Sequence, residues 1–425
     1  MNEDLINFVW RFRLFNQKAL FTSRNEPVEI ISPGFYNSHA GPDFTNVKVR
    51  IGSTTWAGSA EIHIRASDWE RHGHSTDKAY NNVILHVVYE NDMQVFRADG
   101  TEPSVFIIKP YIPEDIQDRY RQLIQNMNWI PCEKQLSHVD HIYVQDCLQR
   151  MLIERMEEKS GQVTELLNHH QGDWAETFYM LLCRTFGFKL NALPFELLAR
   201  SLPLRILNKH RQSLFQLEAL LFGQAGFLEE PATDDYSRSL QEEYRYLRHK
   251  YNLQPIESYL WKHLRLRPQN FPSVRLAQFA SLVHRSVHLF SRILETEEAG
   301  ALRKLFDGIR MSSYWQSHNK PGKESAKIAA GLGRESVNNI LINTVSVALY
   351  SYGKYTDDVH FFSRAISLLE SIPAETNRIV LRYREIGVKS LGADSSQALL
   401  QLKKKYCDQK KCVNCAVGAR IINSA

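Results

Sequence analysis

The 425-residue chain has little of what marks several specialised classes of protein. Six cysteines are too few for a disulfide scaffold, and 20 glycines and 15 prolines exclude a collagen-like or linker-rich chain. No run approaches the roughly 20 apolar residues that a membrane span needs. The first residues also lack the basic and then apolar pattern of a signal peptide. These absences predict a cytoplasmic protein with no membrane contact.

The composition is that of a folded protein of more than one domain. Apolar residues make up 43% and charged residues 23%, which excludes wholesale disorder. At about 150 residues per domain, the length predicts two or three domains. The net charge is only +5, and residues 1–110 carry 11 Lys and Arg against 13 Asp and Glu. If the protein meets a polyanion, the surface that does so is expected in residues 111–425, which carry the positive excess.

The hydrophobic pattern of residues 1–110 predicts one α/β domain. Residues 1–20 have an apolar stripe at helical spacing. The segments Val47–Ile51 and Ala60–Ile64 alternate between apolar and polar residues, which predicts two strands of a hairpin. A capping-box pattern at Ser67–Glu70 predicts the start of a short helix. The continuous apolar run Val83–Tyr89 is typical of a central strand covered on both faces.

From Pro113 onward the pattern is helical. Amphipathic segments such as Leu276–Leu294 and Ser336–Ser351 follow one another without a fixed repeat, and the polar stretch Ser317–Gly333 is expected to be a loop. The predicted fold class is therefore α+β. We expect an α/β domain at 1–110, a large irregular helical domain at 111–395 and a cysteine-bearing tail at 396–425.

A cluster of acids and a histidine marks a candidate site. Glu61 and His63 are two residues apart on a predicted strand, so both side chains project from the same face. Asp43 precedes the partner strand, and the hairpin can bring it beside Glu61. Two converging carboxylates need a neutralising charge, which Mg²⁺ or Mn²⁺ would supply. The alternative is that Asp43 is a turn residue and that Glu61 and His63 lie on a solvated strand face.

This arrangement resembles the PD-(D/E)xK nuclease superfamily, over about residues 1–90. Pro42-Asp43 and Glu61-Ile62-His63 match its Pro-Asp and acid-x-Lys motifs, and His63 stands where Lys is usual. The resemblance implies an αβββαβ core and metal-dependent cleavage of DNA or RNA. It implies that Asp43 and Glu61 bind the ion and that His63 is a base or a third ligand. The alternative function is a catalytically silent nucleic-acid-binding or protein-interaction scaffold.

Further polar residues surround this candidate site. His72 and His74 are expected to orient a scissile phosphate, and so is Asn37 in the preceding loop. A second possibility is that His72, His74 and Asp77 bind Zn²⁺, since imidazole and carboxylate are normal zinc ligands. His86 lies in the middle of a predicted strand, where a hydrogen-bonded core histidine is the usual interpretation.

The tail carries three closely spaced cysteines. The segment Cys407-x4-Cys412-x2-Cys415 predicts a zinc ion or an iron–sulfur cluster, because thiolates at close spacing select such metals. The pattern is similar to the C-terminal cluster loop of iron–sulfur DNA glycosylases. A fourth ligand must come from elsewhere, with Cys132, Cys147, Cys183 or a histidine as candidates. The alternative is a group of reduced thiols that only pack a helix end.

The chain as a whole resembles a bacterial domain-of-unknown-function family. The shared segments are Gly41–Phe44, Glu61–His63 with Ser67–Trp69, Asn82–Val87 and the terminal cysteines. This resemblance spans nearly the full length and implies no established activity.

Overall fold

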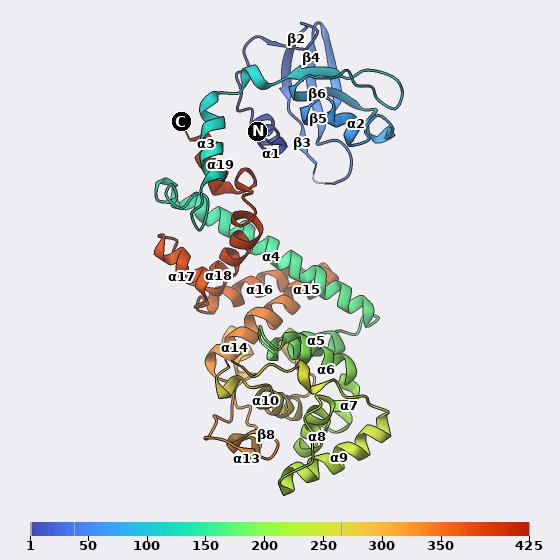
Figure 1. Ribbon diagram of the computed structural model, residues 1–425, viewed down its shortest axis with the longest axis vertical. Helices are drawn as coiled ribbons and strands as arrows, with labels where there is room; N and C mark the ends of the chain where they lie inside the picture. The colour runs from blue at the N-terminus through green and yellow to red at the C-terminus, as the bar shows by residue number, and fades with distance from the viewer. Residues whose placement is uncertain (1, 38, 265, 425) are drawn as a thin grey trace. The chain divides into compact units, whose positions relative to one another are not determined.

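The computed structural model describes residues 2–37, 39–264 and 266–424, and it divides into two compact units. The first unit comprises Met1–Met151, Arg382–Val388 and Leu399–Ala425, and the second comprises Leu152–Leu381 and Lys389–Ala398. The sheet lies in the first unit and the second is mainly helical, so the predicted α+β class is confirmed (Figure 1). The division into 1–110, 111–395 and 396–425 stays a prediction.

A mixed seven-stranded sheet forms the body of the first unit (Figure 1). Its strands lie in the order β1, β2, β4, β5, β6, β7, and β3 pairs with β4 outside this path. The neighbours from β1 to β5 are antiparallel, whereas β5, β6 and β7 are parallel. The bounds are β1 Leu20–Phe21, β2 Pro27–Ser32, β3 Phe35–Tyr36, β4 Phe44–Ile51, β5 Thr54–Arg65, β6 Val83–Glu90 and β7 Ser104–Ile107.

Both faces of the central strands are covered, as the apolar run of β6 predicts. Ala60 and Ile62 of β5 are buried on one face, and Glu61 and His63 are buried on the other. Helix α1 (Glu3–Arg11) and the short helix α2 (Asp68–Arg71) both pack on β5. The interpretation of Glu61 and His63 as a solvated strand face is therefore wrong.

Two local predictions in this unit need correction. The helix expected over residues 1–20 ends at Arg11, because Arg13 adopts a left-handed conformation with φ 53° and breaks the helical path. The short helix expected at Ser67–Glu70 is present as α2 (Asp68–Arg71), but the capping-box hydrogen bond of Ser67 does not form. The Ser67 hydroxyl donates a 2.8 Å hydrogen bond to Asp92, while the Asp68 carboxylate accepts from the backbone N–H of Arg65. These contacts fasten α2 to the ends of β5 and β6.

The remaining helices of the first unit include the folded tail. Helix α3 (Glu114–Gln125) packs against α19 (Ala416–Asn423), and the 3-10 turn Cys412–Asn414 packs against α1. The cysteine-bearing segment thus belongs to the same compact unit as the sheet.

Most of the remaining helices make up the second unit. Helices α4, α17 and α18 contribute residues to both units. The bounds are α4 His141–His169, α5 Trp174–Phe186, α6 Ala192–Ser201, α7 Leu204–Lys209, α8 Leu214–Gln224, α9 Asp235–Tyr251, α10 Pro272–Arg285, α11 Leu289–Glu295, α12 Ala299–Lys304, α13 Ser313–Ser317, α14 Arg334–Ile340, α15 Ser346–Thr356, α16 Val359–Ser371, α17 Arg378–Glu385 and α18 Ala393–Gln401.

Two segments of this unit differ from expectation. The single helix predicted over Leu276–Leu294 is two helices, α10 and α11, because His288 is left-handed with φ 48° and Phe290 stacks on Trp174. The expected loop at Ser317–Gly333 contains a small antiparallel pair, β8 (His318–Lys320) and β9 (Lys323–Glu324). In the described part of the chain, no helix combines the length and apolar character required to cross a membrane.

Candidate metal centre

The hairpin of β4 and β5 brings the two predicted acids together. Phe44 pairs with Ala60, so Asp43 comes to lie beside Glu61. The backbone N–H of Asp43 donates a 3.0 Å hydrogen bond to Glu61 Oε2, and the backbone N–H of Ile62 donates a 3.2 Å hydrogen bond to Asp43 Oδ2. Each carboxylate is therefore anchored by the backbone of the segment that carries the other.

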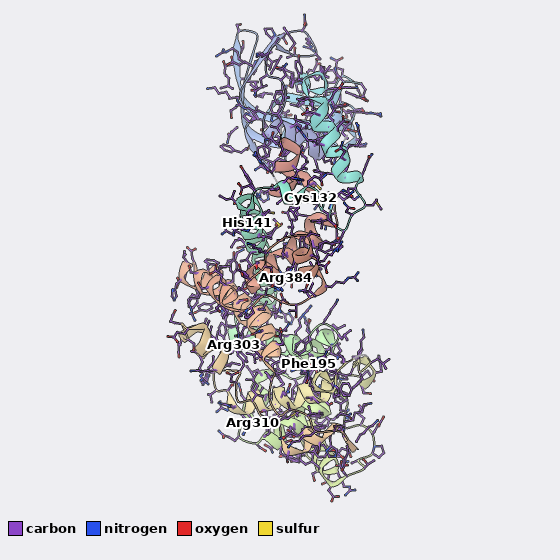
Figure 2. The ribbon with its side chains drawn as sticks, turned by 90° about the vertical axis from the view of Figure 1, so that its left-hand side faces the viewer. Cys132, His141, Phe195, Arg303, Arg310 and Arg384 are labelled. Atoms are coloured by element: carbon purple, nitrogen blue, oxygen red, sulfur yellow. The ribbon has the colours of Figure 1, made fainter. Side chains whose placement is uncertain are left out.

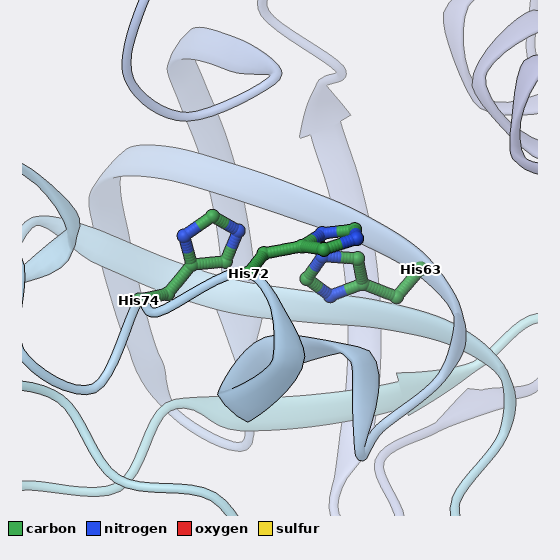
Figure 3. Close-up of side chains that lie close together, drawn as sticks. All are labelled: His63, His72 and His74. Carbon is green, nitrogen blue, oxygen red and sulfur yellow. The ribbon is translucent and has the colours of Figure 1, made fainter.

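Three imidazoles converge on the same face of the sheet (Figure 3). Nitrogen atoms of His63, His72 and His74, one from each ring, all lie within 4.8 Å of one another. His63 projects from β5, whereas His72 and His74 lie in the turn after α2. Gly73 separates them with φ 76°, a conformation that side chains rarely adopt, and it allows both histidines to face inward.

The Glu61 carboxylate joins this group. Its Oε1 lies 3.1 Å from His74 Nε2 and 3.7 Å from His63 Nε2, while His63 Nε2 lies 3.1 Å from His72 Nδ1. In tetrahedral or octahedral coordination at 2.0–2.2 Å, neighbouring ligand atoms are about 3.0–3.5 Å apart. The two separations of 3.1 Å are in this range. The ligand atoms that all lie within 4.8 Å of one another are those of His63, His72 and His74, and Glu61 lies beside two of these three residues.

A buried nitrogen without a hydrogen bond supports the fit to a metal. His74 Nε2 is 3.1 Å from Glu61 Oε1, yet within the described residues it has no hydrogen-bond partner. Leaving a buried polar atom unpaired costs about 1–3 kcal/mol. A cation between the nitrogen and the carboxylate would satisfy both atoms.

His86 holds His63 in place from behind. Its Nε2 lies 2.9 Å from His63 Nδ1, and the ring is fully buried in β6. If His63 Nδ1 carries the proton and donates it to His86, the lone pair of His63 Nε2 is left for an ion. Metal-bound histidines are commonly fixed by such a second hydrogen bond. His86 is thus both a core histidine and a support of the candidate ligand.

Aromatic rings close the other side of the cluster. Tyr80 stacks on His74 with ring centroids 3.8 Å apart, and Trp69 contacts the edges of His63 and His74. Tyr80 and Trp69 are buried. They fix the imidazole orientations and keep bulk water from this side.

Glu3 completes the acidic group and was not predicted from the sequence. It comes from the first turn of α1, and its Oε1 lies 4.0 Å from His63 Nε2. An acid in the first turn of a helix is ordinarily explained by the helix dipole, so no separate signal in the sequence marks Glu3 as a site residue. Only the packing of α1 on β5 brings Glu3 to the site.

Burial and nearby titratable groups shift the pKa values of several side chains in and around the cluster. Burial and the nearby charge of Glu61 raise the pKa of Asp43 to about 8. Burial raises the pKa of Glu3 to about 7, with the charges of Glu61 and Asp68 adding to the effect. Burial and neighbouring imidazoles lower the pKa of His63 to about 2 and that of His86 to about 3. Near neutral pH, His63 is therefore a neutral imidazole suited to binding a metal.

Asn37 and Asp77, two further residues predicted from the sequence, make hydrogen bonds that hold the local backbone. Asn37 Nδ2 donates a 3.0 Å hydrogen bond to the Pro42 carbonyl, and its backbone N–H donates to the Asp43 carbonyl at 2.7 Å. Asn37 therefore holds the loop that carries Asp43, and its role toward a substrate stays a prediction. Asp77 caps the 3-10 turn Lys78–Tyr80 by accepting from the Ala79 N–H.

The tail cysteines gather with two of the three candidates for a fourth ligand. Cys132, Cys147, Cys407 and Cys415 line one small cavity of the first unit. Cys412 is buried beside Cys415. Cys183 belongs to the second unit, where its thiol donates a 3.2 Å hydrogen bond to the Phe195 carbonyl.

A family assignment agrees with the sequence resemblance. The chain belongs to the family described as "Protein of unknown function (DUF2851)", whose model matches residues 3–378. The match includes the sheet, the acids and the histidines, and it ends before the tail cysteines. No curated protein and no solved structure matches the chain.

Proposed function

We propose that this protein is a metal-dependent nuclease whose ion is held at the candidate metal centre. The observation that carries the proposal is the convergence of one carboxylate with three imidazoles beside a second, buried carboxylate. The proposed ligands are Glu61, His63, His72 and His74. Imidazole-rich sites suit Mn²⁺ and Zn²⁺ better than Mg²⁺, which prefers oxygen ligands.

The remaining groups supply positioning and proton transfer. When bound, the ion would polarise a phosphate and lower the pKa of a water molecule. Asp43 positions Glu61 through its backbone N–H. Glu3 is partly exposed, with a pKa of about 7, so it can accept a proton from a water molecule near neutral pH.

The order of elements supports a PD-(D/E)xK-like assignment. Helix α1 precedes the antiparallel strands, and α2 leads into β6, which is parallel to β5. Asp43 comes just before β4, and Glu61 and His63 lie in β5, where the superfamily carries its motifs. The neutral imidazole of His63 replaces a fixed positive charge, so we assign it the role of a ligand.

The second unit offers a surface for the phosphate backbone. It contains a cavity of about 1150 Å³ whose charged lining is mainly basic. The lining cations are Arg155, Lys159, Arg184, Lys189 and Arg200, against Glu165 and Glu196. Such a lining favours a polyanion, and binding through it is expected to weaken as salt concentration rises.

Cleavage assays with single metals test the proposal. Labelled single-stranded and duplex DNA and RNA are incubated with the purified protein and Mg²⁺, Mn²⁺ or Zn²⁺ in turn. We expect cleavage with Mn²⁺ or Zn²⁺, and a fall of at least about 100-fold in Glu61→Gln with binding retained. The matched control is Glu29→Gln, because Glu29 is an exposed acid of the same sheet that pairs with Arg50. Binding without cleavage under all metals would instead support the scaffold function.

A second variant separates the possible roles of His63. His63→Lys restores the residue usual in the superfamily. If His63 is a ligand, the charged lysine repels the ion, so cleavage and metal affinity fall together. Substantial activity in this variant would contradict the ligand role and assign His63 the role of a base or polarising group.

A further inference from the structure

A second group of side chains of the metal-ligating type lies in the first unit, on segments other than those that form the candidate metal centre. Cys407, Cys412 and Cys415 come from the tail, and Cys132 comes from the segment between α3 and α4 (Figure 2). The thiol of Cys132 lies within electrostatic reach of all three tail cysteines. Cys132, Cys407 and Cys415 line one small cavity, and Cys412 is buried in the adjoining turn of the tail, so cysteines from two distant segments lie close together.

We propose that Cys132, Cys407, Cys412 and Cys415 bind an iron–sulfur cluster. The tail has the spacing Cys-x4-Cys-x2-Cys with one distant cysteine, an arrangement that places thiolates around such a cluster in plant-type ferredoxins. The reversed order, with the distant cysteine first in the chain, does not alter this geometry.

The distances favour a cluster over a single zinc ion. Tetrahedral zinc with bonds of about 2.3 Å holds its sulfur ligands about 3.8 Å apart. Cys147 and Cys415 have this separation, but among the described residues no three cysteine sulfurs lie within 4.8 Å of one another. A cluster spreads its thiolates more widely, because they ligate different iron atoms.

The backbone around Cys415 is arranged to support a sulfur ligand. Cys415 is the N-cap residue of α19, so its sulfur lies at the N-terminal end of this helix, near the backbone N–H groups of Val417 and Gly418. A side chain at Gly418 would come within 2.2 Å of the Cys412 carbonyl, so glycine allows the cysteine turn to lie against the helix. The positive end of the helix dipole favours the thiolate form of such a cysteine, which is the form that binds metals.

The surroundings also match an anionic cluster. Lys403 lies near Cys407, Lys410 near Cys412 and Arg150 near Cys415. The cavity is otherwise lined by apolar residues such as Ile130 and Leu402. A water molecule there would lack the two to four polar partners that it needs, whereas a thiolate-bound cluster needs none.

Cys147 is assigned a supporting role. Its sulfur lies 3.8 Å from Cys415, within hydrogen-bond distance for sulfur atoms. We assign Cys147 the role of a hydrogen-bond donor to the Cys415 sulfur, next to the cluster, and not the role of a ligand. The phenolic oxygen of Tyr383 similarly lies 3.4 Å from Cys407.

Anaerobic purification of the full chain tests the cluster. We expect a brown protein with broad visible absorption, with iron and acid-labile sulfide in equal amounts at two or more of each per chain. Zinc in place of iron, or a metal-free protein, would overturn the proposal. These measurements on the wild-type chain do not depend on the fold of any variant.

Serine variants test the ligand assignment. Cys132→Ser and Cys412→Ser should each lose most of the iron, whereas Cys147→Ser and the control Cys183→Ser should keep it. Circular dichroism shows whether each variant has kept its helices. Full iron in Cys132→Ser together with loss in Cys147→Ser would overturn the assignment of Cys132 as the fourth ligand.

Discussion

The histidine cluster and the cysteine cluster lie in the same unit but are assembled over very different sequence distances. His63, His72 and His74 come from one strand and the turn that follows it. Cys132 and Cys407 are separated in the sequence by the whole of the second unit. The first cluster also includes an exposed residue, His72, whereas Cys132, Cys412 and Cys415 are buried and Cys407 is half-buried. A site built locally and partly open is suited to an exchangeable ion, and a buried site that joins distant segments is suited to a permanent group.

Selective metal removal gives the largest expected effect. A chelator such as EDTA should strip the ion from the histidine cluster, because His72 is exposed, and cleavage should fall by orders of magnitude. The buried cysteine cluster should keep its iron. Visible absorption and iron content, measured before and after treatment, check this expectation.

The converse treatment destroys the cysteine cluster and leaves the histidine cluster intact. Ferricyanide should destroy the cluster and bleach the visible absorption. Manganese affinity of the histidine cluster should then remain within about threefold, as long as circular dichroism shows a folded protein. Parallel loss of both metals in either treatment would contradict two separate centres.

The local part of the candidate site could be predicted from the sequence. The period of two in β5 places Glu61 and His63 on one face, and the hairpin returns Asp43 to Glu61. The short distance from β5 to the turn after α2 keeps His72 and His74 close. Such features depend on strand geometry and turn chemistry, which act within a few residues.

The contacts between residues that are distant in the sequence could not be predicted in the same way. Glu3 reaches the site only because α1 packs on β5, and no spacing in the sequence encodes that contact. The sequence left Cys132, Cys147 and Cys183 as equal candidates, and only tertiary packing separates the first two from Cys183. The break between α10 and α11 likewise follows from packing of Phe290 on Trp174, which overrides a continuous helical pattern.

Removal of one exposed ligand, His72, should have the next largest effect, which is a fall in metal affinity. His72→Ala deletes an imidazole at the surface, so the fold should survive while metal affinity falls. Loss of a residue that only hydrogen-bonds to a ligand already lowers metal affinity about 10–100-fold, so loss of a ligand should lower it more than about 100-fold. Isothermal titration with Mn²⁺ or Zn²⁺ measures the change.

The matched control for this variant is His249→Ala, since His249 is an exposed histidine on α9. Its affinity should equal that of the wild type. Unchanged affinity in His72→Ala would remove His72 from the ligand set and leave Glu61, His63 and His74.

The smallest expected effect is on the pH dependence of stability in the metal-free protein. The folded pKa of Asp43, about 8, is above its ordinary value of 3.8, so the folded state holds the proton more tightly than the unfolded state. The resulting stabilisation is complete below about pH 4 and is lost as the pH rises toward 8. Asp43→Asn cannot ionise, so its Tm at pH 8 should exceed that of the metal-free wild type by a few degrees.

Asp307→Asn, at an exposed acid of the second unit, is the matched control and should not shift the Tm. Saturating Mn²⁺ should reverse the order, because the wild-type carboxylate beside the ion is then stabilised in its charged form. Calorimetry at pH 6 and pH 8, with and without the ion, measures both effects, and a lower Tm for metal-free Asp43→Asn at pH 8 would show that the Asp43 hydrogen bond outweighs its buried charge.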